Sequence, residues 1–141
     1  MSVESNIRII ESVLDAFNQH DWDGFVEYYS DSVLNYGPGK SKPIKGREAI
    51  LEDNIQFLKA FPDAHFEISH AFGQDDWVCA VGNFEGTHRG EFSGPGGQSI
   101  PPTGNVVRYP MCVVIKFESD KIVEFHEYFD SVEMARQLGF I

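Results

Sequence analysis

The stretch before the final helix places several titratable side chains on one face of a strand. Polar and apolar residues alternate from Ile122 to Phe129, which is the period of a β-strand. One face would carry Ile122, Glu124, His126, Tyr128 and Asp130. The other face would carry Val123, Phe125 and Phe129, and it is apolar except for Glu127. Carboxyl and imidazole groups beside apolar residues can serve as general acids and bases.

Asp130 has two interpretations. It is our first candidate for a general acid/base, because it ends the polar face among many aromatic residues. The run Asp130-Ser131-Val132-Glu133 also fits a capping box at the start of a helix. Capping lowers the pKa of an aspartate, whereas a base that works at neutral pH needs a raised pKa. Composition and spacing leave both interpretations open.

The histidines offer hydrogen-bond donors for a developing oxyanion. His88 ends the apolar face of a strand, and His126 lies in the last strand, so both are catalytic candidates. The alternative for each is a hydrogen-bonded structural histidine. His70 follows Phe66 and Ile68 at strand spacing, which predicts a place in the core or in a pocket wall. Because the five histidines lack metal-ligand spacing, we expect no metal site, although His70, His88 and His126 could still gather in space.

Aromatic residues make up 13% of the chain and include twelve phenylalanines, enough to build an apolar pocket. The residues expected to bind a substrate in such a pocket are Phe17, Trp22, Tyr36, His70 and Trp77.

Helical periodicity dominates the first part of the chain and strand periodicity the second. The patterns predict helices over 3–19, 47–60 and 131–138 and a short helix after Asp21. They predict strands over 33–36, 66–72, 77–88, 106–118 and 122–129, with loops over 37–43 and 93–104. Helices followed by long antiparallel strands indicate an α+β fold. A strongly bent sheet covered by helices would leave a hollow for a small molecule.

Length and charge narrow the class of protein. The 141 residues suit one domain, 1–141, and the net charge of −11 argues against a nucleic acid or an anionic membrane as partner. No apolar run is long enough for a membrane span, and the N-terminus lacks the pattern of a signal peptide, so we expect a cytoplasmic protein. Cys79 and Cys112 lie in apolar runs, which predicts free core thiols.

Several motifs, in this order and spacing, resemble those of one family. The segment Thr87–Phe92 followed by Ile100–Gly104 resembles the THxGEF…PPTG pattern of SnoaL-like polyketide cyclases and ester cyclases. The residues Lys121–Glu124, Asp130 and Gln137–Gly139 are similar to that family's GKIVE…D…QLG ending. The early segment Gly46–Ile50 agrees with the family as well.

The resemblance implies the NTF2-like cone, a strongly curved mixed or antiparallel sheet with three packing helices and a short C-terminal helix. It also implies a homodimer without a cofactor. In the true cyclases an acidic residue near the chain end is the general acid/base of an intramolecular aldol closure, and Asp130 occupies that matching position. His88 matches the histidine of the THxGEF segment.

The hypothesis from sequence is therefore a cofactor-independent, cyclase-like enzyme that acts on a hydrophobic carbonyl compound. Two alternatives stay open. One is a non-catalytic protein that binds a hydrophobic ligand, and the other is an isomerase or hydrolase on the same fold.

Overall fold

The computed structural model describes residues 2–93 and 98–141 of the chain. Its helices are α1 (Val3–Gln19), α2 (Trp22–Val26), α3 (Arg47–Ala60) and α4 (Ser131–Leu138). Its strands are β1 (Tyr29–Tyr36), β2 (Ile44–Lys45), β3 (His65–Gln74), β4 (Trp77–Thr87), β5 (Phe92–Ser93), β6 (Ser99–Ile100), β7 (Val106–Glu118) and β8 (Lys121–Phe129). The predicted α+β order is confirmed.

Local capping explains the starts of α1 and α2 and the end of α4. Ser2 caps α1 through a reciprocal pair of hydrogen bonds with Ser5. The Asp21 carboxylate accepts the Gly24 N–H at the start of α2. Gly139 ends α4 in the left-handed conformation that glycine adopts without strain.

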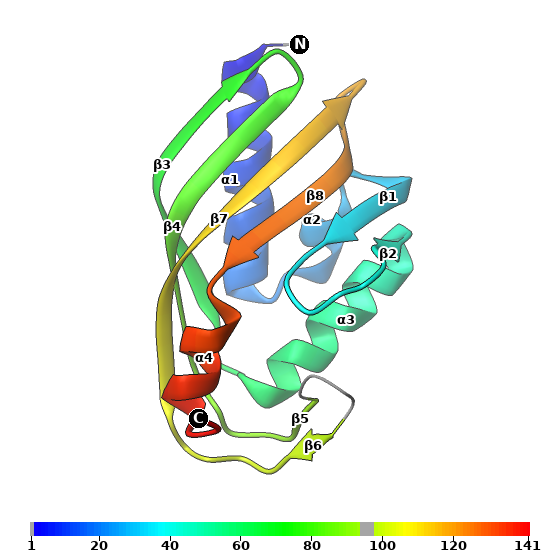
Figure 1. Ribbon diagram of the computed structural model, residues 1–141. Coiled ribbons are helices and arrows are strands. Elements are labelled where there is room, and N and C mark those ends of the chain that lie inside the picture. The colour runs from blue at the N-terminus through cyan, green and yellow to red at the C-terminus, as the bar shows by residue number, and fades with distance from the viewer. Residues whose placement is uncertain (1, 94–97) are drawn as a thin grey trace.

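Six strands form one mixed sheet in the order β2-β1-β8-β7-β4-β3. Only the pairing of β1 with β8 is parallel among the described strands, and it brings the first strand of the chain beside the last. The sheet bends strongly, with α1 lying along its concave side and α3 at the open end near β1 and β2 (Figure 1).

The strands β1 and β2 differ from the sequence prediction. The strand predicted over 33–36 begins earlier, at Tyr29, and the predicted loop over 37–43 leads into the two-residue strand β2. The predicted loop over 93–104 contains the ends of the β5–β6 ribbon, and its residues 94–97 lie outside the described residues.

Two β-bulges change which residues face the core. In β3 the register shifts between Ile68 and His70, so Phe66 is buried whereas His70 and Phe72 are exposed. In β8 the pairing with β7 shifts next to Ile122, and Ile122 is buried with Phe125. The predictions that His70 lies in the core or pocket wall and that Ile122 shares the polar face were therefore wrong.

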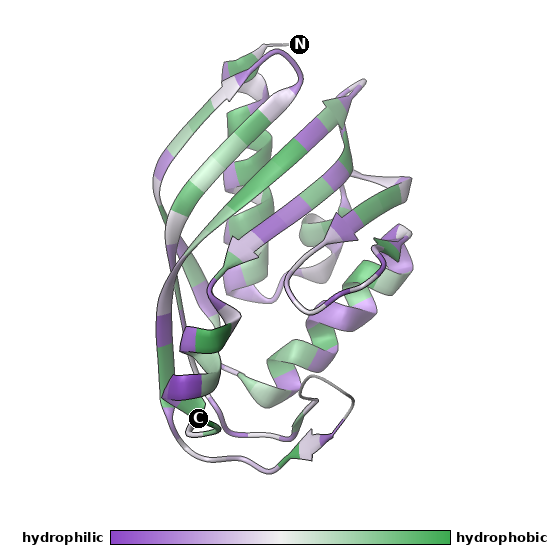
Figure 2. Ribbon diagram, in the orientation of Figure 1, coloured by the Kyte–Doolittle hydropathy of each residue, from purple (hydrophilic) through white to green (hydrophobic). Residues whose placement is uncertain are grey.

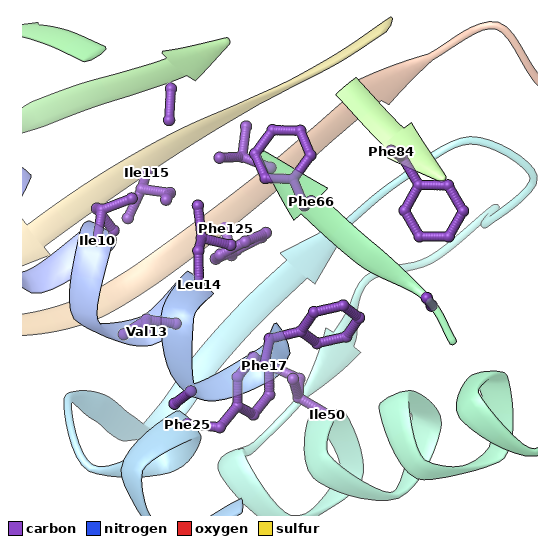
Figure 3. Close-up of a cluster of buried hydrophobic side chains, with 14 of the residues drawn as sticks. Ile10, Val13, Leu14, Phe17, Phe25, Ile50, Phe66, Phe84, Ile115 and Phe125 are labelled. Atoms are coloured by element: carbon purple, nitrogen blue, oxygen red, sulfur yellow. The ribbon is translucent and has the colours of Figure 1, made fainter. Parts of the chain in front are cut away.

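The core lies on the concave side of the sheet. Buried side chains from α1, including Ile10, Val13 and Leu14, pack on residues of the central strands such as Ile115 and Phe125 (Figure 3). Colouring by hydropathy shows a long apolar stretch along β7, whereas polar and apolar segments follow one another along β8 (Figure 2). Cys79 and Cys112 are free but half-buried, which corrects the prediction of core thiols. Among the described helices, none is both long and apolar enough to cross a membrane.

Candidate functional site

A cavity of about 440 Å³ lies between the concave face of the sheet and the helices. This volume is typical of small-molecule sites. Its apolar wall is formed by Leu14, Phe17, Phe25, Phe57, Phe66, Phe84, Phe92, Met111, Val113, Phe125, Phe129 and Met134. Most of these side chains are aromatic, so the cavity presents flat apolar surfaces to its contents.

Polar groups enter this cavity from β1, α3, β7 and β8, from the loop after β1 and from the segment around β5. They are Tyr29 and Asn35 of β1, Lys40 of the following loop, Asp53, Asn54 and Gln56 of α3, Glu91 and Ser93 around β5, Tyr109 of β7 and Glu127 of β8. The cavity therefore combines an apolar wall with a small set of hydrogen-bonding and charged groups.

Among the described strands of the six-stranded sheet, β8 supplies an acidic side chain to the cavity lining, that of Glu127. It follows Phe125 by two residues on β8, so strand alternation directs it to the same, concave side. Burial raises the pKa of Glu127 above its ordinary value, and the charge of Asp53 adds to the rise. The Lys40 ammonium and a hydrogen bond from Asn35 oppose it without cancelling it. A carboxyl with a raised pKa can both accept and return a proton near neutral pH.

Two phenol groups lie within electrostatic range of this carboxyl. Tyr29 and Tyr109 are buried and line the cavity. Burial raises the pKa of both phenols, and the charge of Glu127 raises it further. Both groups therefore stay protonated and available as hydrogen-bond donors.

Lys40 is held at the polar end of the cavity by two partners. Its Nζ lies 3.4 Å from Asn35 Oδ1 and 3.8 Å from Asp53 Oδ2. These contacts tie the loop after β1 to α3. They also fix one positive charge close to Glu127.

The position expected of Asp130 is corrected by the structure. Asp130 is exposed and caps α4, where its Oδ1 accepts the N–H groups of Val132 and Glu133, each at 3.0 Å. It does not belong to the cavity lining among the described residues. The capping interpretation of Asp130 is thus confirmed, and its carboxylate does not face the cavity.

His88 is fully buried and braces a loop. Its Nδ1 accepts the Thr103 N–H at 3.2 Å, and its ring stacks on Phe61. Its backbone N–H donates to the Asn105 carbonyl. His88 is absent from the described cavity lining, so the structure supports the structural alternative for this residue.

His126, Tyr36 and Trp77 lie on the convex face of the sheet and not in the cavity. The rings of Tyr36 and His126 stack with centroids 4.5 Å apart, and Trp77 lies 6.0 Å from His126. His126 Nε2 also contacts Glu124 Oε1 at 2.9 Å. We expected these three side chains to contact a ligand together with Asp130, but none of them is in the described lining of the cavity.

Of the other expected substrate-binding residues, Phe17 lines the cavity. Trp22 packs edge-on against Phe25 just behind the lining. His70 is exposed on the opposite side of the sheet from Phe66. Within the described ranges, the histidines do not gather, and no group of three potential metal ligands is found.

Sequence reasoning missed Glu127 as a candidate, although one signal was available. Glu127 is the single charged residue on a face that otherwise carries Phe125 and Phe129. A charge placed on an apolar strand face must be either solvated through a cavity or neutralised. Lys40, Tyr29 and Tyr109 gave no such signal, because their grouping depends on the parallel β1–β8 pairing and on β7.

A bent mixed sheet with helices on its concave side and a cavity between them defines the NTF2-like, or ketosteroid isomerase-like, class of folds. The sequence model of the SnoaL-like polyketide cyclase family matches residues 7–138. The chain belongs to that family, as the sequence resemblance predicted. A search of the curated proteins finds no match.

Solved structures agree with this fold. IdmH of Streptomyces antibioticus, provisionally described as a polyketide cyclase, is 26% identical, with a TM-score of 0.80 over 95% of this chain and 98% of that one. AclR of Streptomyces galilaeus, provisionally described as a hydroxylase, is 23% identical, with a TM-score of 0.83 over 99% of both chains. A Catenulispora acidiphila protein described by its ketosteroid isomerase-like fold is 14% identical, with a TM-score of 0.77 over 94% and 93%.

Proposed function

We propose that this protein is an acid/base enzyme that needs no cofactor and closes a ring in a hydrophobic carbonyl compound by an aldol-type reaction. The observation that carries the proposal is Glu127, a carboxyl with a raised pKa on the wall of an aromatic cavity. Membership of the SnoaL-like polyketide cyclase family supports the same class of reaction.

In the proposed reaction Glu127 takes a proton from a carbon next to a carbonyl group. The electrons of that C–H bond form an enolate, whose carbon then attacks a second carbonyl in the same molecule. The new C–C bond leaves an alkoxide, and Glu127 returns its proton to that oxygen. One group thus serves as base and then as acid.

Tyr29 and Tyr109 are the proposed donors to the enolate oxygen. Both phenols are protonated and lie close enough to Glu127 for its charge to act on them. Donors fixed in a water-poor cavity stabilise a developing negative charge more than water does, because they need no reorganisation. The aromatic wall would hold the chain of the substrate folded, so that the two carbonyl groups meet.

The experiment follows the first proton transfer with 2-tetralone, a hydrophobic ketone with acidic α-hydrogens. NMR in D₂O would measure the rate at which the α-hydrogens are replaced by deuterium. We expect Glu127→Gln to lower the protein-catalysed rate by about 100-fold or more, which is the usual contribution of a general base. Asp130→Asn should leave that rate unchanged, because Asp130 caps α4 outside the cavity.

The outcomes separate the candidate functions. Equal rates for Glu127→Gln and wild type, or loss of exchange in Asp130→Asn alone, would refute Glu127 as the base. Binding of 2-tetralone without any acceleration of exchange would favour the non-catalytic ligand-binding alternative.

We also propose that the convex face of the sheet pairs with a second copy of the chain. Large apolar or aromatic side chains exposed there include Phe72, Trp77 and Tyr128. Lys116 of β7 and Glu124 of β8 are opposite each other in the strand register and lie on the same face. Two copies related by a twofold axis would therefore present opposite charges to each other.

Sedimentation should detect a dimer of the wild type. Tyr128→Glu should weaken this dimer, whereas Phe140→Glu, at a residue exposed near the C-terminus, should leave it intact. A monomeric wild type would contradict the pairing.

A further inference from the structure

Glu127 borders two separate hollows. One is the aromatic cavity, and the other is a hollow of about 260 Å³ lined by Tyr36, Gly37, Pro38, Glu127 and Tyr128. Only Pro38 and Glu127 belong to both described linings. The second hollow lies beside Tyr128, which is 55% exposed, so it faces the solvent side of the sheet. The same carboxyl therefore separates the substrate cavity from a second, outer space.

Gly37 leaves this outer space open next to the carboxyl. A Cβ at Gly37 would lie 3.6 Å from Glu127 Oε2 and 3.5 Å from Lys40 Nζ. Both polar atoms thus lie close to the position that a side chain at residue 37 would take. Gly37 does not have the left-handed backbone seen at Gly39 and Gly46, so its conformation accepts other residues. Glycine matters at this position because it has no side chain that would occupy the space beside Glu127 and Lys40.

Lys40 lines the aromatic cavity and is not in the described lining of the outer hollow, but its Nζ lies 3.5 Å from the Cβ position of Gly37, so a small polar molecule beside Gly37 can reach it. Asn35 and Asp53 hold its ammonium on one side, and among the described residues its ion pair is formed with Asp53 and not with Glu127. An ammonium donates hydrogen bonds and a carboxylate accepts them. A water molecule beside Gly37 can therefore bridge Lys40 and Glu127.

We propose that the hollow beside Gly37 is a proton-exchange port, through which water reaches Glu127 while the substrate fills the aromatic cavity. This inference rests on the proposed function, because it assigns the port to the base of that reaction. The protonated Glu127 passes its proton to water held by Lys40, and its carboxylate then takes a different proton from that water. No bond to the substrate changes, and the net result is exchange of one hydrogen isotope for another.

The port determines whether the hydrogen removed from the substrate is the one returned to it. Without the port, a carboxyl enclosed with its substrate would give back the same hydrogen. With the port, the hydrogen is replaced from solvent before it is returned. A substrate whose hydrogen moves from one carbon to another makes this difference measurable.

The experiment uses 3-cyclohexenone deuterated at the α-carbon between its two double bonds, in ordinary water. Removal of an α-deuteron and return of a hydrogen to the γ-carbon gives 2-cyclohexenone, and mass spectrometry with NMR measures the deuterium at the γ-carbon. We expect low γ-deuterium with the wild type and an increase of about threefold or more with Gly37→Val, which closes the port. Gly37→Ala meets only ordinary contact distances, so it should fold and give a smaller increase in the same direction. Ser41→Val, on the exposed part of the same loop, should match the wild type.

Each outcome bears on the inference. Unchanged γ-deuterium in both Gly37 variants, with isomerisation still catalysed and still dependent on Glu127, would overturn the port and leave the proposed function standing. A wild type that does not catalyse the isomerisation, or a Glu127→Gln variant as active as the wild type, would refute the proposed base and the port with it.

Discussion

At the scale of single residues, the polar environment of a carboxyl decides its role more than its place in a motif. Asp130 and Glu127 are three residues apart at the end of the chain. Backbone N–H groups at the start of α4 donate hydrogen bonds to the exposed Asp130 carboxyl, whereas Glu127 faces the aromatic cavity. Spacing could predict the cap of α4, but the surroundings of Glu127 depend on strands distant in sequence.

Lys40→Met tests the charge that acts on Glu127. The Lys40 ammonium lowers the pKa of Glu127, so its removal should raise that pKa further. The pH at which α-proton exchange of 2-tetralone reaches half its maximum should move upward in the variant. Lys42→Met, in the same loop but exposed, should leave the midpoint in place. A downward shift in Lys40→Met would contradict the assignment of these charges.

Asp130→Ala tests the cap. Loss of the two hydrogen bonds to the α4 N-terminus should lower the free energy of unfolding by about 1 kcal/mol. Urea denaturation would measure that loss, and the exchange rate of 2-tetralone should stay at the wild-type value. Full stability combined with loss of exchange would return the catalytic role to Asp130.

At the scale of the elements, periodicity predicts which segments form and fails where a strand bulges. Amphipathic spacing predicts α1 and α3, and the Asp130 cap predicts the start of α4, with the bounds observed. The extra residue in β3 moves His70 to the outer side, and the shift in β8 moves Ile122 to the core. Because side chains alternate with a period of two, each bulge inverts the faces predicted beyond it.

Two hydrogen bonds from Thr87 to Asp63 join the end of β4 to the turn between α3 and β3. Asp63 accepts the Thr87 N–H and the Thr87 hydroxyl, each at 2.7 Å. Partial burial opposes ionisation of Asp63, but these hydrogen bonds and the charge of Arg89 outweigh it, so the pKa of Asp63 lies below its ordinary value of 3.8. A carboxyl whose pKa is lower in the folded state stabilises the fold fully above its unfolded pKa. That contribution is lost as the pH falls through the folded pKa.

Thr87→Val should therefore make the fold less stable at neutral pH and less sensitive to acid. We expect the difference in unfolding free energy between wild type and variant to shrink as the pH falls below about 4, where unfolded aspartate becomes protonated. Urea denaturation at a series of pH values would measure it. A difference that stays constant across this range would show that Asp63 does not clamp Thr87 in its ionised form.

At the scale of the whole molecule, the bend of the sheet creates the cavity. Sequence order and composition predict helices packed on long strands with many aromatic residues. They do not predict which aromatic residues face inward, because the curvature and the parallel β1–β8 pairing join distant segments. Phe17 was predicted to meet a ligand and lines the cavity, whereas Tyr36 and Trp77 lie on the other face.

Met111→Trp tests whether this space receives the ligand. Met111 of β7 is partly exposed and lines the cavity. The larger indole side chain of tryptophan should therefore occupy part of the cavity volume with little strain in the core. We expect the affinity for 2-tetralone to fall by about tenfold, as measured by calorimetry, while the melting temperature stays close to that of the wild type. Arg108→Trp, exposed on the same strand, is the matched control. Unchanged affinity in Met111→Trp would place the ligand elsewhere.

The most direct test of the account compares two pH titrations of the same protein. ¹³C NMR would follow the Glu127 carboxyl, assigned by its loss in Glu127→Gln, and the 2-tetralone assay would follow α-proton exchange. We predict a common midpoint above the ordinary pKa of glutamate, 4.5, with exchange lost as the pH falls and Glu127 becomes protonated. A Glu127 carboxyl that titrates at or below 4.5, or an exchange rate that does not follow its titration, would contradict Glu127 as the base.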